Sequence, residues 1–514
     1  MSFPISTAHV LRSLCLLPCV LLLGISTPPA TTPSGTAAAD SPDGWRKRLE
    51  TDAHAMHDAI QAHHPGPFDS GNPGFSRLLD SGLARALERA QDTRDFGGYW
   101  WALREYQASF DDGHLQLATQ PGAPTLPARW PGFLTRYDAG RHVVAVGAAQ
   151  EASLPEEGAE LIACDGIAAD ALAEQLVGHF RGRWSLESQR LEHGGRLFID
   201  AANPWITPPQ RCQFRVQGQP RDYTLQWREL PDAEFEPMLA RTQAGARTSI
   251  GLRGTYGNRG LWLSMGRFDG NPGSEAYGQL TALMQQLRDE KRVASADFVV
   301  LDVRGNGGGS SHWSRLIAEQ LWGDARVQAQ KIGSDAVDWR ASPENLAYIE
   351  KIRTQIGQQA QPDPQVMEWA DTVIAGLKQS LAQSRPLWRQ TDSDDTDQPS
   401  TPKQPARLKP GARVYILADG SCASACLDAL DLWKALGAAQ LGRTTSADTV
   451  YMEIRGHRMP SGLAAIGVPM KVYRGRPRGN NQPYEPDLAF NARMDDDLAI
   501  ESWLLGLADT GSPR

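Results

Sequence analysis

Two stretches of this 514-residue sequence combine residue types and spacing that could do chemistry. The first is a cluster of four glycines, Gly305 and the three at 307–309, which follows the apolar run 298–303. Adjacent glycines let backbone N–H groups point into a cavity unobstructed, so such a turn can bind a phosphate or an oxyanion. The spacing fits neither GxxxxGKS/T nor GxGxxG, and a plain strand-to-helix turn is the alternative.

The second stretch is DGSCASAC, in which Ser424 lies between a strand pattern and a helix pattern. A serine at such a turn is well placed as a nucleophile, because the N–H of the next residue, Ala425, and the positive end of the helix can stabilise negative charge. A serine that only caps the helix is the alternative, and the local sequence favours neither.

The segments around both stretches must position them. Residues 260–325 alternate between strand and helix patterns, and the alternation resumes at 412–420, which predicts an α/β layer with parallel strands. We expect six regions: a signal peptide at 1–39, a helical region at 45–118, a small β-rich unit at 127–230, the first part of the α/β core at 250–340, a helical insertion with a polar loop at 341–405, and the second part of the core at 406–510.

The N-terminal region has the pattern of a secretory signal. It carries Arg12 and no acidic residue, then an apolar run at 14–25 and three alanines at 37–39. The run is too short to span a bilayer comfortably, so we expect cleavage near Ala39. The mature protein would be exported, periplasmic or extracellular, with no stable membrane span after cleavage. A retained single anchor is the alternative.

The composition excludes several classes of protein. Apolar residues make up 41% of the chain and charged residues 22%, which argues against a collagen-like, wholly disordered or polytopic membrane protein. The net charge of −8 lacks the basic excess of a broad nucleic-acid binder, so we expect no nucleic-acid partner.

Cleavage of the signal peptide would leave four of the six cysteines. An even number in an exported chain allows disulfides. Cys422 and Cys426 bracket Ser424 at a spacing that a disulfide can bridge, and a bridge from Cys164 to Cys212 would tie two strands of the β-rich unit. Free buried thiols are the alternative.

Taken together, RGNGGG after a VVLD strand and the later DGSCASAC resemble the tail-specific (C-terminal processing) serine protease family, in its tricorn-like and retinoid-binding-protein-like branch. The resemblance implies an α/β fold with a crotonase/Clp-protease-like catalytic core, an N-terminal helical region and an inserted PDZ-like domain. It places the nucleophile at Ser424. Residues 156–172 resemble a stretch of the PDZ-like domain, and YEPDLAF (484–490) resembles the closing strand.

The sequence departs from this family at the general base. Most members use a lysine about two dozen residues after the serine, but 442–450 contains none, and Lys434 and Lys471 lie elsewhere. The segment QASFDDGHLQLAT resembles the DGH segment of tricorn-like members, which implies His114 as the base. Imidazole suits this role because it titrates near neutral pH. A structural loop histidine is the alternative.

The residue that orients this histidine stays open at the level of sequence. Tricorn-like members have a glutamate shortly before the closing strand, and Glu485 and Asn480 lie near that place. Glu453 and Asp448 are further candidates. A carboxylate is the usual partner, although an amide can also orient a histidine.

We therefore expect an exported serine peptidase that acts through an acyl-enzyme, with an oxyanion hole formed by N–H groups of Gly307, Gly308 and Ala425. The resemblance implies a peptide or protein substrate and neither metal nor cofactor, and it leaves the oligomeric state open. The alternatives are a non-catalytic ligand-binding member of the same fold and an esterase, because the same machinery serves esters.

Overall fold

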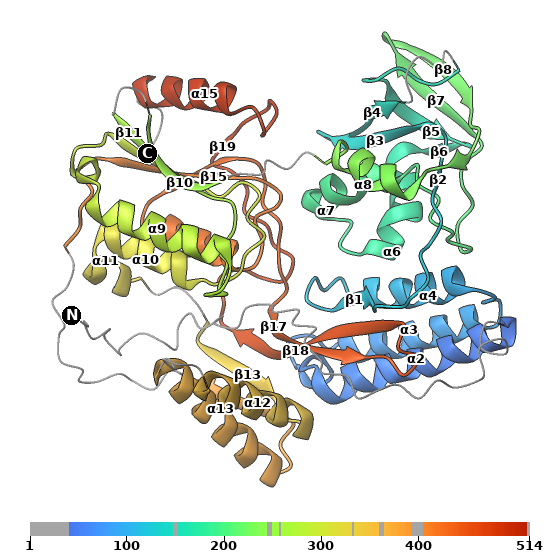
Figure 1. The fold of residues 1–514 in the computed structure, drawn as a ribbon, viewed down its shortest axis with the longest axis horizontal. Coiled ribbons are helices and arrows are strands. Elements are labelled where there is room, and N and C mark those ends of the chain that lie inside the picture. The colour runs from blue at the N-terminus through green and yellow to red at the C-terminus, as the bar shows by residue number, and fades with distance from the viewer. Residues whose placement is uncertain are drawn as a thin grey trace. The chain divides into compact units, whose positions relative to one another are not determined.

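The computed structural model describes residues 41–147, 153–243, 249–255, 259–330, 334–358, 364–391 and 405–510. The expected signal peptide at 1–39 lies outside this part. The chain forms two compact units (Figure 1). The serine unit, named after Ser424, contains Gly245–Glu453 and Met470–Arg514. The histidine unit, named after His114, contains the described residues of 41–243 and Ile454–Pro469.

The serine unit is built on a six-stranded sheet in the order β10-β11-β12-β15-β16-β19. Every neighbouring pair is parallel except β10 and β11. This is the α/β layer with parallel strands that the sequence predicts. The strands are β10 (Ile250–Thr255), β11 (Gly260–Met265), β12 (Phe298–Asp302), β15 (Arg413–Ala418), β16 (Ala439–Gly442) and β19 (Leu488–Ala489).

Helices cover both faces of this sheet, and strand β12 shows why, since all of its residues are buried. Successive side chains of a strand point to opposite faces. Val299 and Leu301 join the core formed with α9, α10 and α14, whereas Phe298 and Val300 join the core formed with α15. The helical elements are α9 (Glu275–Asp289), η4 (Lys291–Ala294), α10 (His312–Trp322), α11 (Asp324–Gln328), α14 (Ala425–Ala435) and α15 (Asp497–Thr510).

A smaller group of strands in the serine unit carries the expected helical insertion. Strand β13 pairs with β14 and with the C-terminal half of β18, and α12 and α13 pack on these strands. The helices are predicted from the sequence, whereas β13 and β14 are not, because AVDWR and LWRQT are short and mix polar with apolar residues. The polar loop at 392–404 lies outside the described residues. The elements are β13 (Ala336–Arg340), α12 (Pro343–Gly357), α13 (Pro364–Ala382), β14 (Leu387–Thr391), β17 (Tyr451–Arg458) and β18 (Ala464–Arg474), the last two divided between the units.

The histidine unit begins with three helices in the range expected to be helical. The first starts at its cap, where Ser41 Oγ accepts a hydrogen bond from Gly44 N at 3.1 Å. It ends at His63, with His64 as the C-cap just before Pro65. Strand β1 follows the helices and pairs antiparallel with the N-terminal half of β18. The elements are α2 (Pro42–His63), η1 (Gly66–Phe68), α3 (Phe75–Ala90), α4 (Phe96–Ala108) and β1 (Gln116–Thr119).

The β-rich part of the histidine unit contains a sheet in the order β3-β4-β5-β7-β8, with β6 paired to β5. A disulfide between Cys164 and Cys212 joins β5 to β7. The strands are β2 (Arg129–Trp130), β3 (Phe133–Asp138), β4 (Arg141–Gly147), β5 (Glu160–Cys164), β6 (Ile167–Ala168), β7 (Arg211–Val216), β8 (Gln219–Thr224) and β9 (Arg228–Glu229). The helical elements are α5 (Ala169–Ala173), η2 (Glu174–Gly178), α6 (His179–Arg181), α7 (Glu187–His193), η3 (Gly194–Arg196) and α8 (Asp232–Ala240).

Throughout the part of the chain that the structure describes, no helix combines the length and the apolar character that crossing a membrane requires.

Candidate active site

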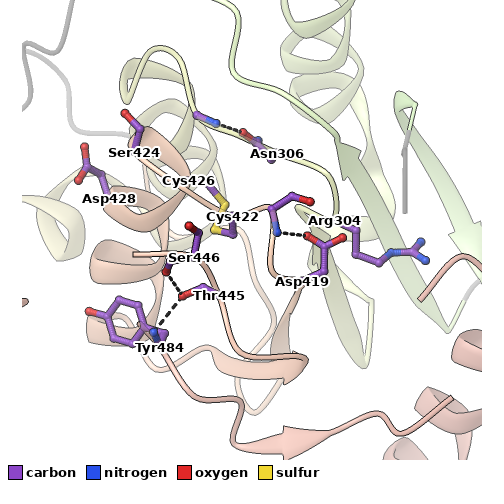
Figure 2. Close-up of a disulfide and its surroundings, with 12 residues drawn as sticks. Arg304, Asn306, Asp419, Cys422, Ser424, Cys426, Asp428, Thr445, Ser446 and Tyr484 are labelled. Atoms are coloured by element: carbon purple, nitrogen blue, oxygen red, sulfur yellow. Dashed lines mark hydrogen bonds between the residues drawn. A yellow bond between two sulfur atoms is a disulfide. The ribbon is translucent and has the colours of Figure 1, made fainter. Parts of the chain in front are cut away.

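The glycine cluster and Ser424 follow two neighbouring strands of the six-stranded sheet. Strands β12 and β15 are parallel, with Asp302 opposite Leu417, and Val303 N continues the pairing by donating to Leu417 O at 2.9 Å. The carboxyl ends of adjacent parallel strands meet at the same edge of a sheet, which is where open α/β folds bind ligands. The topology therefore brings together two motifs that are more than 100 residues apart (Figure 2).

Gly308 packs directly against Ser424. Its φ of +104° lies in the region that favours glycine. A Cβ on Gly308 would lie 2.7 Å from Ser424 Cβ and 2.7 Å from Ala423 O, so no larger residue fits without displacing the serine. Asn306 holds this turn, because its Oδ1 accepts from Gly308 N at 2.8 Å and its Nδ2 donates to Met265 O at 2.7 Å.

Ser424 has a strained backbone at the start of α14. Its φ of 54° and ψ of −123° are unusual for a residue with a side chain, and such a conformation costs about 1–3 kcal/mol. The N–H of Ser424 donates to Asp448 Oδ2 at 2.7 Å. A disulfide joins Cys422 to Cys426 across the same turn. In α/β-hydrolases, a strained strand-to-helix turn is the geometry that presents the nucleophilic serine.

Two backbone donors beside this turn have no acceptor. Among the residues that the structure describes, neither Gly307 N nor Ala425 N donates a hydrogen bond, whereas Gly308 N is taken by Asn306. Ala425 is the first residue of α14, where the helix dipole is positive. Of the three N–H groups expected to form an oxyanion hole, Gly307 and Ala425 therefore offer unpaired donors.

A buried arginine supports Asp448 and the helix behind Ser424. The guanidinium of Arg478 lies 3.3 Å from Asp428 Oδ1, 3.4 Å from Asp431 Oδ2 and 4.0 Å from Asp448 Oδ2. Ser311 Oγ, at the start of α10, donates to Asp428 Oδ2 at 2.7 Å. These contacts connect the acceptor of the Ser424 N–H to α14 and α10.

The side chain of Asp419 links the glycine loop after β12 to the loop that precedes Ser424. Its Oδ1 accepts from Gly305 N at 3.1 Å and from Ser421 N at 3.0 Å. Burial raises the pKa of Asp419 to about 6, even though these two backbone hydrogen bonds favour the charged form. The carboxyl group thus fixes the ends of β12 and β15 relative to each other.

His114 lies in the histidine unit, in the loop between α4 and β1. Its backbone N donates to Asp112 Oδ1 at 2.8 Å, and its Nδ1 lies 4.0 Å from the same oxygen. This Nδ1 is buried and forms no hydrogen bond among the described residues. Catalytic hydrogen bonds are often long before substrate binds, so the distance is compatible with Asp112 orienting the ring.

Asp112 is itself held by a second buried histidine. Its Oδ2 lies 3.6 Å from His64 Nε2. Burial raises the pKa of Asp112, but the contact with His64 and the charge of His114 outweigh burial and hold the pKa below its ordinary value. Burial lowers the pKa of His64 and so favours its neutral form. Because His64 Nδ1 accepts a hydrogen bond from Gly66 N at 2.8 Å, the neutral ring carries its proton on Nε2, which faces Asp112.

The other candidates for an orienting residue have partners in the serine unit. Thr444 Oγ1 donates to Glu485 Oε2 at 2.6 Å, and Val450 N donates to Asn480 Oδ1 at 2.6 Å. Glu453 forms a buried ion pair with Lys471, with 3.2 Å between Oε2 and Nζ. Lys471, one of the two lysines near the serine in sequence, is therefore held in an ion pair.

Sequence reasoning missed Asp112, Asp419 and His64. Asp112 stands inside the DGH segment, so its position two residues before His114 was an available signal. His64 is fully buried, directly after the last residue of α2. No sequence pattern links His64 to Asp112, because the contact depends on the packing of the loop after α2 against the loop after α4. Within the described ranges, no group of three or more His, Cys, Asp or Glu residues could hold a metal ion.

No protein-family model matches the chain, and no curated protein matches its sequence. Among solved structures, mature CPAF is 13% identical with a TM-score of 0.58, over 91% of this chain and 99% of that chain. Mature CPAF complexed with lactacystin matches at 13% identity and a TM-score of 0.58, over 91% and 100%. The tricorn protease matches at 13% identity with a TM-score of 0.38, over 90% of this chain and 37% of that chain. The α/β fold class is confirmed, and the chain shares the fold of mature CPAF.

Proposed function

We propose that this chain is an exported serine peptidase that cleaves peptide bonds through an acyl-enzyme intermediate. The observation that carries the proposal is the contact between two loops, in which Gly308 packs against Ser424. The unpaired N–H groups belong to the neighbouring residues Gly307 and Ala425. A nucleophile flanked by two free donors is what the formation of a tetrahedral intermediate requires.

In this proposal, Ser424 Oγ attacks the carbonyl carbon of the scissile bond, and the carbonyl oxygen becomes an oxyanion. The N–H groups of Gly307 and Ala425 stabilise that oxyanion, with the positive end of α14 adding to the effect. The amine leaves, and water then hydrolyses the ester on Ser424. Asn306 keeps Gly308 N occupied and so fixes the conformation of the loop.

His114 is the proposed general base, which takes the hydroxyl proton of Ser424 and returns it to the leaving amine. We assign the orienting role to Asp112, since its carboxylate stays ionised and lies beside His114 Nδ1. The partners of Glu485 and Asn480 argue against either residue in that role. A lysine base is disfavoured because Lys471 is paired with Glu453.

A peptide or protein substrate is proposed from the family resemblance and from the fold shared with mature CPAF. Export is proposed from the signal-peptide pattern at 1–39. The two disulfides, Cys164–Cys212 and Cys422–Cys426, support an oxidising compartment. The β-rich part of the histidine unit is proposed to be the PDZ-like domain.

A fluorophosphonate probe tests the proposal, because it labels only an activated serine. We expect labelling of the mature protein at Ser424, located by peptide mass spectrometry, and no labelling of the Ser424→Ala variant. A library of unlabelled peptides then distinguishes a peptidase from an esterase. Absence of labelling under conditions in which the protein is folded would instead support a non-catalytic binding protein.

A further inference from the structure

The histidine unit contains a group of three arginines that form no close ion pair with a carboxylate among the described residues. Arg104 lies on α4, Arg181 ends α6 and Arg196 ends η3. Among the residues that the structure describes, none of the three forms an ion pair with a carboxylate. Among the described residues, the side chains of the three arginines form a single hydrogen bond, from Arg104 Nη1 to Leu117 O at 3.5 Å.

These guanidinium groups influence one another. Burial lowers the pKa of Arg181, and the charges of Arg196 and Arg104 lower it further. Burial, followed by the charge of Arg196, lowers the pKa of Arg104 to about 10. The carboxylates of Glu192 and Glu236 oppose this lowering in part, but neither forms an ion pair with the arginines among the described residues, so the cost of burying like charges is only partly offset.

Two of these guanidinium groups lie over aromatic rings, but the rings do not accept hydrogen bonds from their N–H groups. The guanidinium carbon of Arg181 lies 5.4 Å from the centroid of Trp101, and that of Arg196 lies 5.9 Å from the centroid of Phe235. A cation–π contact leaves the N–H edge of the guanidinium unsatisfied. The Nε atoms of Arg104 and Arg196 are buried and have no hydrogen-bond partner among the described residues.

A small cavity lies at this cluster. Arg181 and Arg196 line it together with Asn203, and its other walls are mostly apolar. Its volume of about 30 Å³ exceeds what one water needs but is too small for a whole amino-acid residue. The apolar lining residues are Trp101, Leu176, Val177, Phe180, Ile199 and Ile206.

We propose that this cavity is a binding site for a carboxylate group carried on an aliphatic chain. The forked donors of Arg181 and Arg196 match a carboxylate, the volume fits the head group, and the apolar wall accepts the adjoining methylene groups. The carboxylate could belong to a free small acid or to an acidic side chain of a peptide, since both present the same chemistry. The site lies within the histidine unit and does not depend on the chemistry of Ser424.

Thermal unfolding of the full mature chain tests this proposal with sodium pentanoate as the probe. A ligand that binds the folded state raises Tm in a saturable way. We expect pentanoate to raise Tm in a saturable way. Pentanamide, and sodium chloride at equal ionic strength, should not raise it. The tripeptide Ac-Gly-Glu-Gly-amide, with Ac-Gly-Gln-Gly-amide as its control, reports whether an acidic side chain binds as well.

Three variants locate the effect. Arg181→Gln combined with Arg196→Gln should abolish the rise in Tm, and Arg196→Lys, which keeps the charge but loses the fork, should weaken pentanoate binding at least about tenfold. Arg221→Gln, an exposed arginine on β8, is the matched control and should bind as the wild type does. If the double variant does not fold, Arg196→Lys and the comparison of acid with amide on the wild type still decide.

The proposal is overturned if neither carboxylate raises Tm in a saturable way, or if pentanamide or chloride raises it equally. It is also overturned if the arginine variants respond as the wild type does. Because the readout is binding, failure here leaves the labelling of Ser424 untouched, and absence of that labelling leaves this result untouched.

Discussion

The N–H of Ser424 donates a hydrogen bond of 2.7 Å to the side chain of Asp448, which lies 24 residues further along the chain. The donor belongs to a residue with a φ of 54°, a conformation that surrounding contacts must hold in place. Asp448 is buried and close to Arg478, so the acceptor is itself fixed. The position of the proposed nucleophile therefore depends on a residue that does not touch the reacting atoms.

Replacing Asp448 with alanine should misplace the serine without removing it. We expect kcat to fall about 10- to 100-fold with little change in KM, because small errors in the position of a nucleophile are costly. Loss of the hydrogen bond should also lower the free energy of unfolding by about 1–2 kcal/mol. Asp448→Asn keeps an accepting oxygen and should recover much of kcat. A purely structural role would instead give two variants with equal kcat and different stability.

Replacing Ser424 with alanine should abolish hydrolysis. Loss of a triad nucleophile lowers kcat by about 10⁴-fold or more, and the fold should be retained because the side chain forms no hydrogen bond among the described residues. Ser421→Ala, in the same loop, is the matched control and should keep its activity. Near-normal turnover of a peptide by Ser424→Ala would contradict the assignment.

Gly308 should tolerate no side chain. In Gly308→Ala the new Cβ would meet Ser424 Cβ at 2.7 Å, so we expect a loss of about 100-fold or more in kcat as the serine is displaced. Gly278→Ala is the control, because a Cβ there has no atom within 4 Å and the residue lies on α9, outside the proposed site. Its kcat should stay within about threefold of the wild type. Equal losses in both variants would argue against the contact between the loops.

The order of elements around the site could be predicted from the sequence because it depends on local patterns. The apolar run that forms β12 and the small residues before α14 each carry their own signal, and adjacent parallel strands bring their ends together. That reasoning places the glycine loop near Ser424 without any knowledge of distances.

Contacts that depend on packing could not be predicted. The strained backbone of Ser424 and its bond to Asp448 need the register of the loop after β16, which no periodicity encodes. The pairing of Trp339 with Trp388 across β13 and β14 joins short segments on either side of two helices. The sequence pattern of these two strands is weaker than that of the helices between them, because the preference of a residue for a strand depends on the side chains that it packs against.

Replacing His114 with glutamine should remove the general base. We expect kcat/KM to fall by about 10³-fold or more, with the fold intact. Asp112→Asn keeps the size of the orienting side chain but loses its charge, and kcat should fall while KM changes little. Full activity of His114→Gln would point to a different base.

Asp419 should make the stability of the fold depend on pH. Its pKa is about 6 in the folded protein, whereas an aspartate in an unfolded chain has a pKa of about 3.9. The folded state therefore binds this proton more tightly. The stability that results is fully present below about pH 4 and is lost as the pH rises to 6. The difference of about 2 in pKa corresponds to about 3 kcal/mol.

Asp419→Asn stays neutral at every pH and removes this dependence. We expect the wild type to lose about 2 kcal/mol of unfolding free energy relative to the variant between pH 4 and pH 7, measured by urea denaturation at both values. The loss should be complete by about pH 6.5, because Asp419 is then mostly ionised. An offset between wild type and variant that does not change with pH would show that Asp419 is ionised in the folded protein throughout, and that its two backbone hydrogen bonds outweigh its burial.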